Sequence, residues 1–414
     1  MSIYTQCEAA YVASKTWALL SGATRNQVLS DMARALRDHV GILLEANRAD
    51  IDNAHVLGMA QGLIDRLTLT QERIFQLANS VDELVGLPDP LGRIVDGWTT
   101  PNGLRISQTR VPLGVVAMIY EARPNVTVDA VCLCFKTGNA VVLRGSASAQ
   151  SSNKALVLVL RKVLESHGLD ASGIQLLEDV THEGVSELVS YRQFLSVVIP
   201  RGGSALIQRV VMDSKVPTIE TGVGNCHIFV DASASLEEAV RIIENAKVQR
   251  PSVCNACETV LIHADIASQL LPVLCQRLHG LGVEMRGCEI TLSHVPSISL
   301  AGASDWETEF LDLILAIKVV DSLEEAIDHI GRYGTHHSEA ILSNDLHNVT
   351  RFEQAIDAAV VLVNTSTRFV DGGQFGFGAE IGISTQKLHV RGPVGLQGLT
   401  TYKYLVAGEG QVRG

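Results

Sequence analysis

From residue 112 onward the chain alternates short apolar runs with helical stretches, and this alternation constrains the fold most strongly. Residues 115–119, 140–144 and 195–199 are short, apolar and rich in valine, and residues 156–164 between them have helical periodicity. Apolar runs of this length form strands that are buried on both faces, and strands separated by helices build parallel sheets. The sequence therefore predicts an α/β fold.

A second α/β block follows the first. Apolar runs predict strands at residues 228–230, 259–262, 316–320 and 359–364. Ser235 and Ser322 each precede a glutamate by three residues, which is the capping-box pattern of a helix start. These boxes predict helices that reach about Val248 and Tyr333. A chain of 414 residues is too long for one ordinary core, so two domains are expected.

The region before the first block has helical periodicity from residue 7 to about residue 79. Residues 92–100 and 104–111 are β-rich and are joined through Asn102-Gly103, a strong hairpin signal. Such a hairpin is either an arm that meets another subunit or a plain surface hairpin, and the residues favour neither. The β-like segment 398–404 is expected to pair with the hairpin of a neighbour.

Composition excludes several classes of function. A net charge of −12 argues against general nucleic-acid binding. Eight scattered cysteines are too few for a secreted disulfide scaffold and favour a reduced, cytoplasmic protein. The first 20 residues lack a signal-peptide pattern, and no apolar run is long enough to span a membrane.

The clearest candidate for chemistry is Cys254, in the polar segment Gln249-Arg250-Pro251-Ser252-Val253-Cys254-Asn255. It follows a long helical pattern and lies near Arg250, and a neighbouring cation or a helix end lowers the pKa of a thiol. A buried structural cysteine is the alternative, but the local polarity favours a nucleophile.

Cys254 and Cys257 form a C-x-x-C pair, which raises zinc and redox interpretations. A zinc site needs four ligands, and the other close pair, Cys132 and Cys134, lies in an apolar segment. We therefore expect no metal. A reversible Cys254–Cys257 disulfide that switches off the thiol is a separate hypothesis, which peroxide treatment and mass spectrometry would test.

Three further features could contribute to a site. Asn125 follows a strand end and a proline, where its amide could donate to an oxyanion or cap a helix. Glu220 could be a general base, an orienting group or a solvated carboxylate. Strand ends also run into glycine-containing turns, which can bind phosphate at a helix start; they are Arg144, Gly145 and Ser146, and Gly202, Gly203 and Ser204.

Taken in order, these residues resemble the aldehyde dehydrogenase superfamily, most closely its γ-glutamyl phosphate reductase branch. The resemblance covers nearly the whole chain. It rests on Pro124-Asn125 after a strand, the Gly-Gly-Ser turn, Glu220-Thr221-Gly222-Val223-Gly224-Asn225-Cys226-His227 and the cysteine that follows. Further matching runs are residues 119–127, 249–255, 337–341, 366–376 and 386–393.

The resemblance implies NADPH-dependent reduction of L-glutamyl 5-phosphate to L-glutamate 5-semialdehyde, with release of phosphate, in proline biosynthesis. Cys254 matches the family's nucleophile and Asn125 its oxyanion amide. Arg144 stands where most aldehyde dehydrogenases carry a lysine near the cofactor ribose. Glu309 matches their ribose-binding glutamate, although the surrounding Gly-Pro of their motif is missing. Glu220 takes a secondary role, since this reaction needs no hydrolytic water.

The implied architecture is two Rossmann-like domains with a hairpin oligomerisation arm. Residues 1–91 and 113–222 would form the cofactor domain, 92–112 the arm, 223–385 the catalytic domain, and 386–414 a segment returning to the cofactor domain and arm. Arg250, Arg201 and Arg368 are candidates for holding the substrate phosphate.

The expected partners are a separate glutamate kinase and further copies of the chain, either as a dimer or as a tetramer. A hydrolytic aldehyde dehydrogenase that uses Glu220 to activate water is the alternative enzyme, and a non-catalytic scaffold is the alternative of another class. A P-loop kinase is disfavoured, because no G-x-x-x-x-G-K-[ST] motif occurs.

Overall fold

The chain forms two compact units in this computed structural model, which describes residues 1–413 without the side chain of Ser204. Unit 1 consists of Met1–Thr221, Gly376–Gly382 and Pro393–Gly414, and unit 2 consists of Gly222–Phe375 and Ile383–Gly392. The segment Gly376–Gly382 thus belongs to unit 1, although the sequence placed it within residues 223–385.

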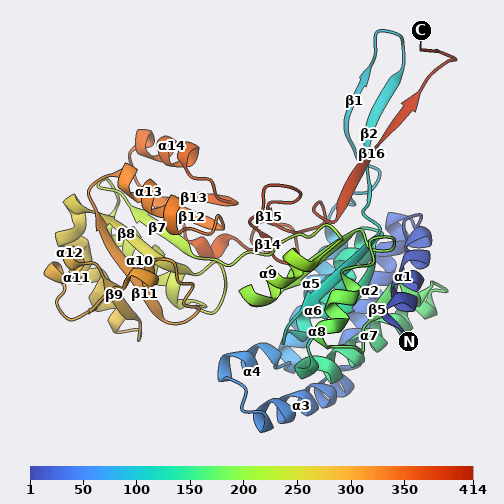
Figure 1. Ribbon diagram of the computed structural model, residues 1–414, viewed down its shortest axis with the longest axis horizontal. Coiled ribbons are helices and arrows are strands. Elements are labelled where there is room, and N and C mark those ends of the chain that lie inside the picture. The colour runs from blue at the N-terminus through green and yellow to red at the C-terminus, as the bar shows by residue number, and fades with distance from the viewer. Residues whose placement is uncertain (414) are drawn as a thin grey trace. The chain divides into compact units, whose positions relative to one another are not determined.

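Unit 1 is built on a four-stranded parallel sheet in the order β5-β4-β3-β6. Helices of the same unit cover this sheet (Figure 1). Its strands are β3 (Val115–Tyr120), β4 (Ala140–Arg144), β5 (Ile174–Leu176) and β6 (Val197–Arg201). Every residue of β3 and β4 is buried, which explains their continuous apolar sequences. The predicted parallel sheet is confirmed.

The order of the strands reverses between β3 and β6. Helices α6 (Pro124–Lys136) and α7 (Gln150–Ser166) connect β3 to β4 and β4 to β5 in one direction across the sheet. The connection through α8 (His182–Leu188) then returns past β3 to β6. Right-handed crossovers in opposite directions place helices on opposite faces, and such a switch point is where open α/β sheets bind ligands.

The remaining helices of unit 1 follow the predicted N-terminal helical region, with α9 after β6. Trp17 at the end of the first helix packs edge-on against Phe135 of α6, with ring centroids 4.9 Å apart. This contact joins the N-terminal helices to the sheet. The helices are α1 (Ile3–Trp17), α2 (Gly22–Asp38), α3 (Val40–Val56), α4 (Gln61–Leu67), α5 (Gln71–Gly86) and α9 (Ser204–Asp213).

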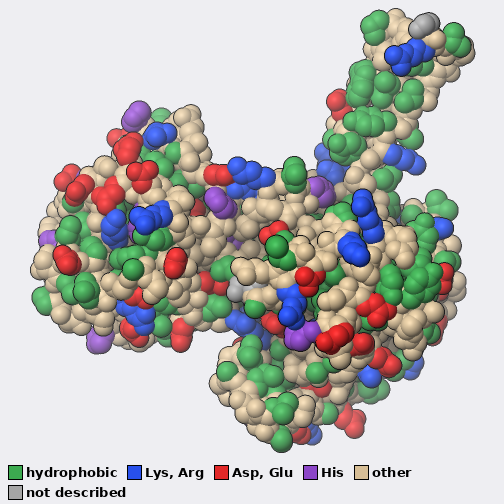
Figure 2. Space-filling view, in the orientation of Figure 1, with side chains coloured by type: hydrophobic (Ala, Val, Ile, Leu, Met, Phe, Trp, Pro, Cys, Tyr) green, Lys and Arg blue, Asp and Glu red, His purple; other side chains and the backbone are tan. Residues whose placement is uncertain are grey.

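The predicted hairpin is present as β1 (Ile94–Thr99) and β2 (Arg105–Pro112), and a third strand extends it. β16 (Thr400–Ala407) pairs antiparallel with β2 over eight residues. This segment was expected to pair with the hairpin of a neighbour, but it pairs with the hairpin of its own chain. The buried Asn139 amide holds Leu399 O next to the start of β16 and so directs the strand to its own β2. Apolar side chains lie exposed along the arm (Figure 2).

Unit 2 contains a seven-stranded parallel sheet in the order β10-β9-β11-β8-β7-β12-β13. Its buried positions form the core of this unit. The strands are β7 (Cys226–Val230), β8 (Cys257–His263), β9 (Glu284–Gly287), β10 (Ser299–Leu300), β11 (Ile314–Val320), β12 (Ser338–Leu342) and β13 (Val360–Val363).

Helices connect the strands of unit 2. Both predicted helix starts are confirmed, with a serine as the N-cap: Ser235 accepts from Glu238 N and Ser322 from Glu325 N. The helices are α10 (Leu236–Val248), α11 (Ala264–His279), α12 (Glu289–His294), α13 (Leu323–Tyr333) and α14 (Leu346–Ala355). Short elements complete the chain: η1 (Ala147–Ala149), η2 (Ala171–Gly173), η3 (Ala303–Trp306), η4 (Thr367–Phe369), β14 (Ile383–Ser384) and β15 (Gly392–Pro393).

Candidate active site

Cys254 lies in the turn between α10 and β8, at the edge of the sheet where β7 and β8 begin. A backbone hydrogen bond of 3.0 Å from Ala256 N to Val253 O closes the turn around it. The neighbouring Asn255 is buried, and its amide nitrogen donates to Val370 O at 2.8 Å. Cys254 itself remains partly exposed, so a rigid backbone holds an accessible thiol.

Gly224 packs directly against the backbone of Cys254. A Cβ atom at this position would lie 1.5 Å from the Cys254 carbonyl oxygen, so only glycine fits. The same carbonyl accepts a hydrogen bond from the Cys226 thiol at 3.2 Å. The glycine-rich segment that the sequence singled out therefore forms the wall behind the thiol.

Glu309 lies beside this wall. Its carboxylate accepts a hydrogen bond from Gly224 N at 2.8 Å. The resemblance assigns Glu309 to the cofactor ribose. The same carboxylate would then both bind the ribose and hold Gly224, which packs against Cys254. The ribose contact stays a prediction.

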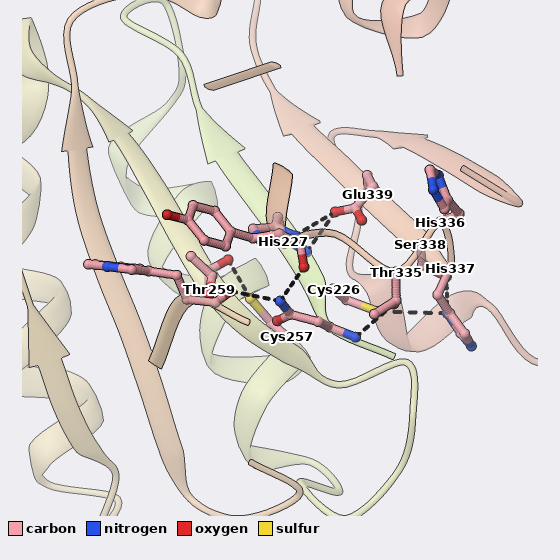
Figure 3. Close-up of polar contacts among 12 residues, drawn as sticks. Cys226, His227, Cys257, Thr259, Thr335, His336, His337, Ser338 and Glu339 are labelled. Carbon is pink, nitrogen blue, oxygen red and sulfur yellow. Dashed lines mark hydrogen bonds and ion pairs between the residues drawn. The ribbon is translucent and has the colours of Figure 1, made fainter. Parts of the chain in front are cut away.

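Cys226 starts strand β7 and is fully buried (Figure 3). Burial raises its pKa well above the usual range, and nearby Glu339 adds to this shift. The group is therefore a protonated thiol, as its donation to Cys254 requires. His337 Nδ1 lies 3.7 Å from the sulfur and 2.8 Å from Ser338 Oγ.

Cys257 begins β8 and is the other half of the C-x-x-C pair. It is fully buried, its thiol donates to Thr259 O at 3.4 Å, and burial raises its pKa far above the usual range. A disulfide with Cys254 requires its thiolate, which these surroundings disfavour. The disulfide stays a hypothesis.

Two arginines bring positive charge to the turn. Arg368, in η4, is half-buried, and burial lowers its pKa while Asp371 opposes this shift; Arg250, Cys254 and Cys226 interact with it electrostatically. Its guanidinium donates to Gln249 Oε1 at 2.9 Å and also contacts the Asn255 amide oxygen. Arg250 is exposed in the turn itself. The planar guanidinium of arginine matches the geometry of a phosphate group.

A pocket of about 240 Å³ adjoins these residues within unit 2. Amide, carboxylate and guanidinium groups line it, a set that suits a polar ligand with charges of both signs. The lining residues are Asn245, Gln249, Arg368, Phe369, Asp371 and Gln374.

In unit 1, Asn125 is the second residue of α6, after Pro124 at the first helical position. Its amide nitrogen donates to the Asp129 carboxylate at 3.2 Å. Burial raises the pKa of Asp129 to about 7, although the bond from Asn125 and the charge of Arg201 oppose this shift. Asp129 thus fixes the orientation of an amide whose predicted task is to donate to an oxyanion.

Arg144 and Gly145 stand at the carboxyl end of β4. Arg144 is 7% exposed, and its guanidinium donates to the carbonyl oxygens of Val180 and Thr181, the latter at 3.1 Å. Burial lowers the pKa of Arg144. A Cβ at Gly145 would meet the Asn153 amide at 2.3 Å. Both residues therefore have structural roles: Arg144 binds two backbone carbonyl groups, and Gly145 leaves space for Asn153. A contact with the cofactor would be an additional role.

Ser146 follows at the same strand end, and its hydroxyl lies 2.7 Å from that of Ser148. Glu220 lies half-buried near the end of the first segment of unit 1. Its neighbour Thr221 anchors the chain there, by donating from its hydroxyl to Pro200 O at 2.6 Å. The suggested secondary role of Glu220 stays a prediction.

Gly202 and Gly203 lie at the switch point of the unit 1 sheet, between β6 and α9, and Ser204 begins that helix. Gly203 N donates to the Glu121 carboxylate at 2.9 Å, and a Cβ at Gly202 would lie 2.6 Å from the same group. The helix start therefore holds the Glu121 carboxylate in this structure, and the binding of a cofactor pyrophosphate at this turn stays a prediction.

Sequence reasoning missed three residues of the thiol's surroundings: Cys226, Lys247 and Glu258. Cys226 gave no signal beyond its place in the matched run. Lys247 falls next to Ala246 on the buried stripe of α10 with Ala239 and Ile243, and a lysine on an apolar stripe is a signal for a buried partner.

Comparison with known proteins identifies the family. Residues 2–299 match the model of the aldehyde dehydrogenase family. A γ-glutamyl phosphate reductase from Thermoanaerobacter pseudethanolicus is 50% identical over 100% of both chains. This chain belongs to the aldehyde dehydrogenase family, in its γ-glutamyl phosphate reductase branch.

Other relatives agree. A γ-glutamyl phosphate reductase from a Geobacillus species is 54% identical over 97% of each chain. The crystal structure of γ-glutamyl phosphate reductase from Thermotoga maritima matches over 100% of both chains, with 47% identity and a TM-score of 0.97. An acetylating aldehyde dehydrogenase from Geobacillus thermoglucosidasius, 17% identical with a TM-score of 0.73 over 100% of this chain and 97% of its own, shares the fold.

Within residues 1–413, no group of three or more His, Cys, Asp and Glu side chains is arranged to hold a metal ion. None of the helices in that part of the chain has the length and apolar character of a membrane span.

Proposed function

We propose that this chain reduces L-glutamyl 5-phosphate to L-glutamate 5-semialdehyde and releases phosphate, using NADPH. The observation that carries the proposal is the partly exposed Cys254, held in a rigid turn beside Arg250 and Arg368. The relatives that match the full chain are named for this reaction. The step belongs to proline biosynthesis, and we expect it to take place in the cytoplasm.

The thiolate of Cys254 attacks the acyl carbon of the substrate and forms a tetrahedral oxyanion. The Cys254 backbone N–H and the Asn125 amide are the predicted donors to this oxyanion, and losing one such donor typically costs about 2.7–4 kcal/mol. The carbon–oxygen bond to phosphate then breaks and leaves a thioester on Cys254. Arg250 and Arg368 are the proposed phosphate ligands, with Arg201 as a third candidate.

NADPH, when bound, would supply the hydride that reduces the thioester carbon, and the Cys254 thiolate would leave as the aldehyde forms. The turn Gly202-Gly203-Ser204 at the switch point would hold the pyrophosphate, and Arg144, Gly145, Ser146 and Glu309 are the other proposed cofactor ligands. Membership of the family implies a nicotinamide cofactor. The choice of NADPH over NADH is part of this proposal.

The polar pocket beside Arg368 is suited to the glutamyl part of the substrate. Its Asp371 carboxylate can accept from an ammonium group, and its Asn245 and Gln374 amides can donate to a carboxylate. A glutamate kinase that supplies the acyl phosphate, and association of several copies of the chain through the arm, are further parts of the proposal.

The test is run in the reverse direction with purified protein. Glutamate 5-semialdehyde and NADP⁺ should yield NADPH only when inorganic phosphate is added, and Cys254→Ser should abolish this activity. Cys288→Ser is the matched control, because Cys288 is the other partly exposed cysteine and should be dispensable. Turnover without phosphate would instead indicate a hydrolytic aldehyde dehydrogenase, and full activity of Cys254→Ser would refute the assigned nucleophile.

A further inference from the structure

Lys247 and Glu258 form an ion pair at the base of the turn that carries Cys254. Lys247 lies in the last turn of α10, and Glu258 is the second residue of β8. Lys247 Nζ and Glu258 Oε2 are 2.6 Å apart, and both side chains are 0% exposed. The pair therefore links the two ends of residues 248–257, and Cys254 lies inside this closed loop.

A pair of buried charges needs an explanation other than stability. Removing two charges from water costs several kcal/mol per ion, and well-packed apolar residues in the same place are often as stable or more so. Burial accordingly raises the pKa of Glu258 to about 7, although Lys247 opposes the shift. An ion pair differs from apolar packing because its hydrogen bond has a preferred geometry. It therefore fixes how the two chain segments that carry Lys247 and Glu258 are oriented to each other.

Glu258 also reaches the wall behind the thiol. Its second oxygen, Oε1, accepts from Leu311 N at 3.2 Å, where Leu311 has a left-handed backbone with φ of 54°. Two residues earlier in the same loop, Glu309 holds Gly224 N, and Gly224 packs against the Cys254 carbonyl. Glu258 is thus joined to the nucleophile both through its own strand and through this loop.

We propose that Lys247 and Glu258 are positioning residues for Cys254, holding its turn closed and its carbonyl against Gly224. The role in turnover rests on the proposed function, whereas the effect on the geometry of the thiol does not. Neither side chain touches substrate, so their loss should lower the rate of the chemical step more than the affinity for substrate.

The test uses the double variant Lys247→Met/Glu258→Gln in the full chain, assayed at pH 8. It leaves no unpaired charge, keeps similar volumes and retains an amide oxygen for Leu311 N, so it should fold. We expect kcat to fall by roughly tenfold or more while KM changes by less than about threefold, because small misplacements of a reacting group are costly. The single variants should be less stable, since each leaves one partner buried alone.

A second readout does not depend on any activity. The rate at which iodoacetamide modifies Cys254, measured by mass spectrometry, should change at least about threefold in the double variant, because the surroundings of the thiol control its reactivity. Lys318→Met/Glu325→Gln is the control, since that pair bridges 2.8 Å at the surface of unit 2. A double variant with wild-type kcat and wild-type alkylation would overturn the proposal. Altered alkylation without any reductase activity in the wild type would refute only the proposed function.

Discussion

Gly224 offers the sharpest test of how the site is built, through the substitution Gly224→Ala. The added methyl group would lie 1.5 Å from the Cys254 carbonyl oxygen, 2.4 Å from its carbon and 2.8 Å from its Cα. All three are backbone atoms, so the clash cannot be relieved by a change of side-chain rotamer. The Cys254 turn and the Gly224 segment must move apart by roughly 2 Å to reach ordinary van der Waals separation.

The expected effects follow from this displacement. Overpacking of a well-packed region costs about 1–3 kcal/mol of stability. A shift of about 1 Å in a reacting group lowers the rate on the order of 10²-fold, so kcat should fall by at least that factor. The hydrogen bond from the Cys226 thiol should also be lost, since the carbonyl oxygen that accepts it is the atom that must move.

The assay is the phosphate-dependent reduction of NADP⁺, together with thermal unfolding and alkylation of Cys254. Gly331→Ala is the matched control, because Gly331 lies in α13 of the same unit and a Cβ there meets nothing within 4 Å. This control should keep full activity and gain about 0.4–1 kcal/mol of stability. A folded Gly224→Ala protein with kcat within about twofold of wild type would show that the position of the Cys254 carbonyl does not control the reaction.

Three further predictions use other parts of the chain. The pKa of Asp129 rises from 3.8 in the unfolded chain to about 7 in the folded chain, so the folded state binds a proton more tightly and the stability of the wild type should fall as pH rises from about 4 to 7. In thermal unfolding, Asp129→Asn should remove this decrease in stability, and an unchanged pH profile would refute the assignment. Arg368→Gln should raise KM for phosphate by about tenfold or more, the loss of one charged hydrogen bond, and an unchanged KM would exclude Arg368 as a ligand. Trp98→Glu/Tyr404→Glu on the arm, whose rings lie 6.2 Å apart, should reduce the mass measured by light scattering, and an unchanged mass would exclude the arm from association.

Much of the fold could be predicted because local signals agree with the final structure. The valine-rich run at residues 140–144 is strand β4 with the predicted bounds, and Ser322 caps the predicted helix to Tyr333. β12 (Ser338–Leu342) was not predicted. Its sequence places two polar residues at the start of a fully buried strand, and Glu339 is tolerated there because it accepts from His227 N and lies 3.0 Å from His227 Nδ1 (Figure 3).

Cys254 could be proposed as the nucleophile from the sequence because the residues around it are polar, and the structure leaves it partly exposed. Its catalytic role stays a prediction. The Lys247–Glu258 pair and the Cys226 thiol could not be found in this way, because their roles depend on which strands lie side by side. β7 and β8 are neighbours in the sheet, with Cys226 opposite Cys257, and the sequence contains no local signal for that pairing.

The pairing of β16 with β2 has a consequence for synthesis on the ribosome. Arg110 and Thr400, which bond across these strands, are separated by 290 residues, so β2 is made long before its partner. The amide of the buried Asn139 donates to Leu399 O, so this hydrogen bond also forms only after residue 399 has been made. Until then the edge of β2 is open and can pair with a strand of another nascent chain. The interval between making the two strands therefore leaves an unpaired strand edge, which favours aggregation.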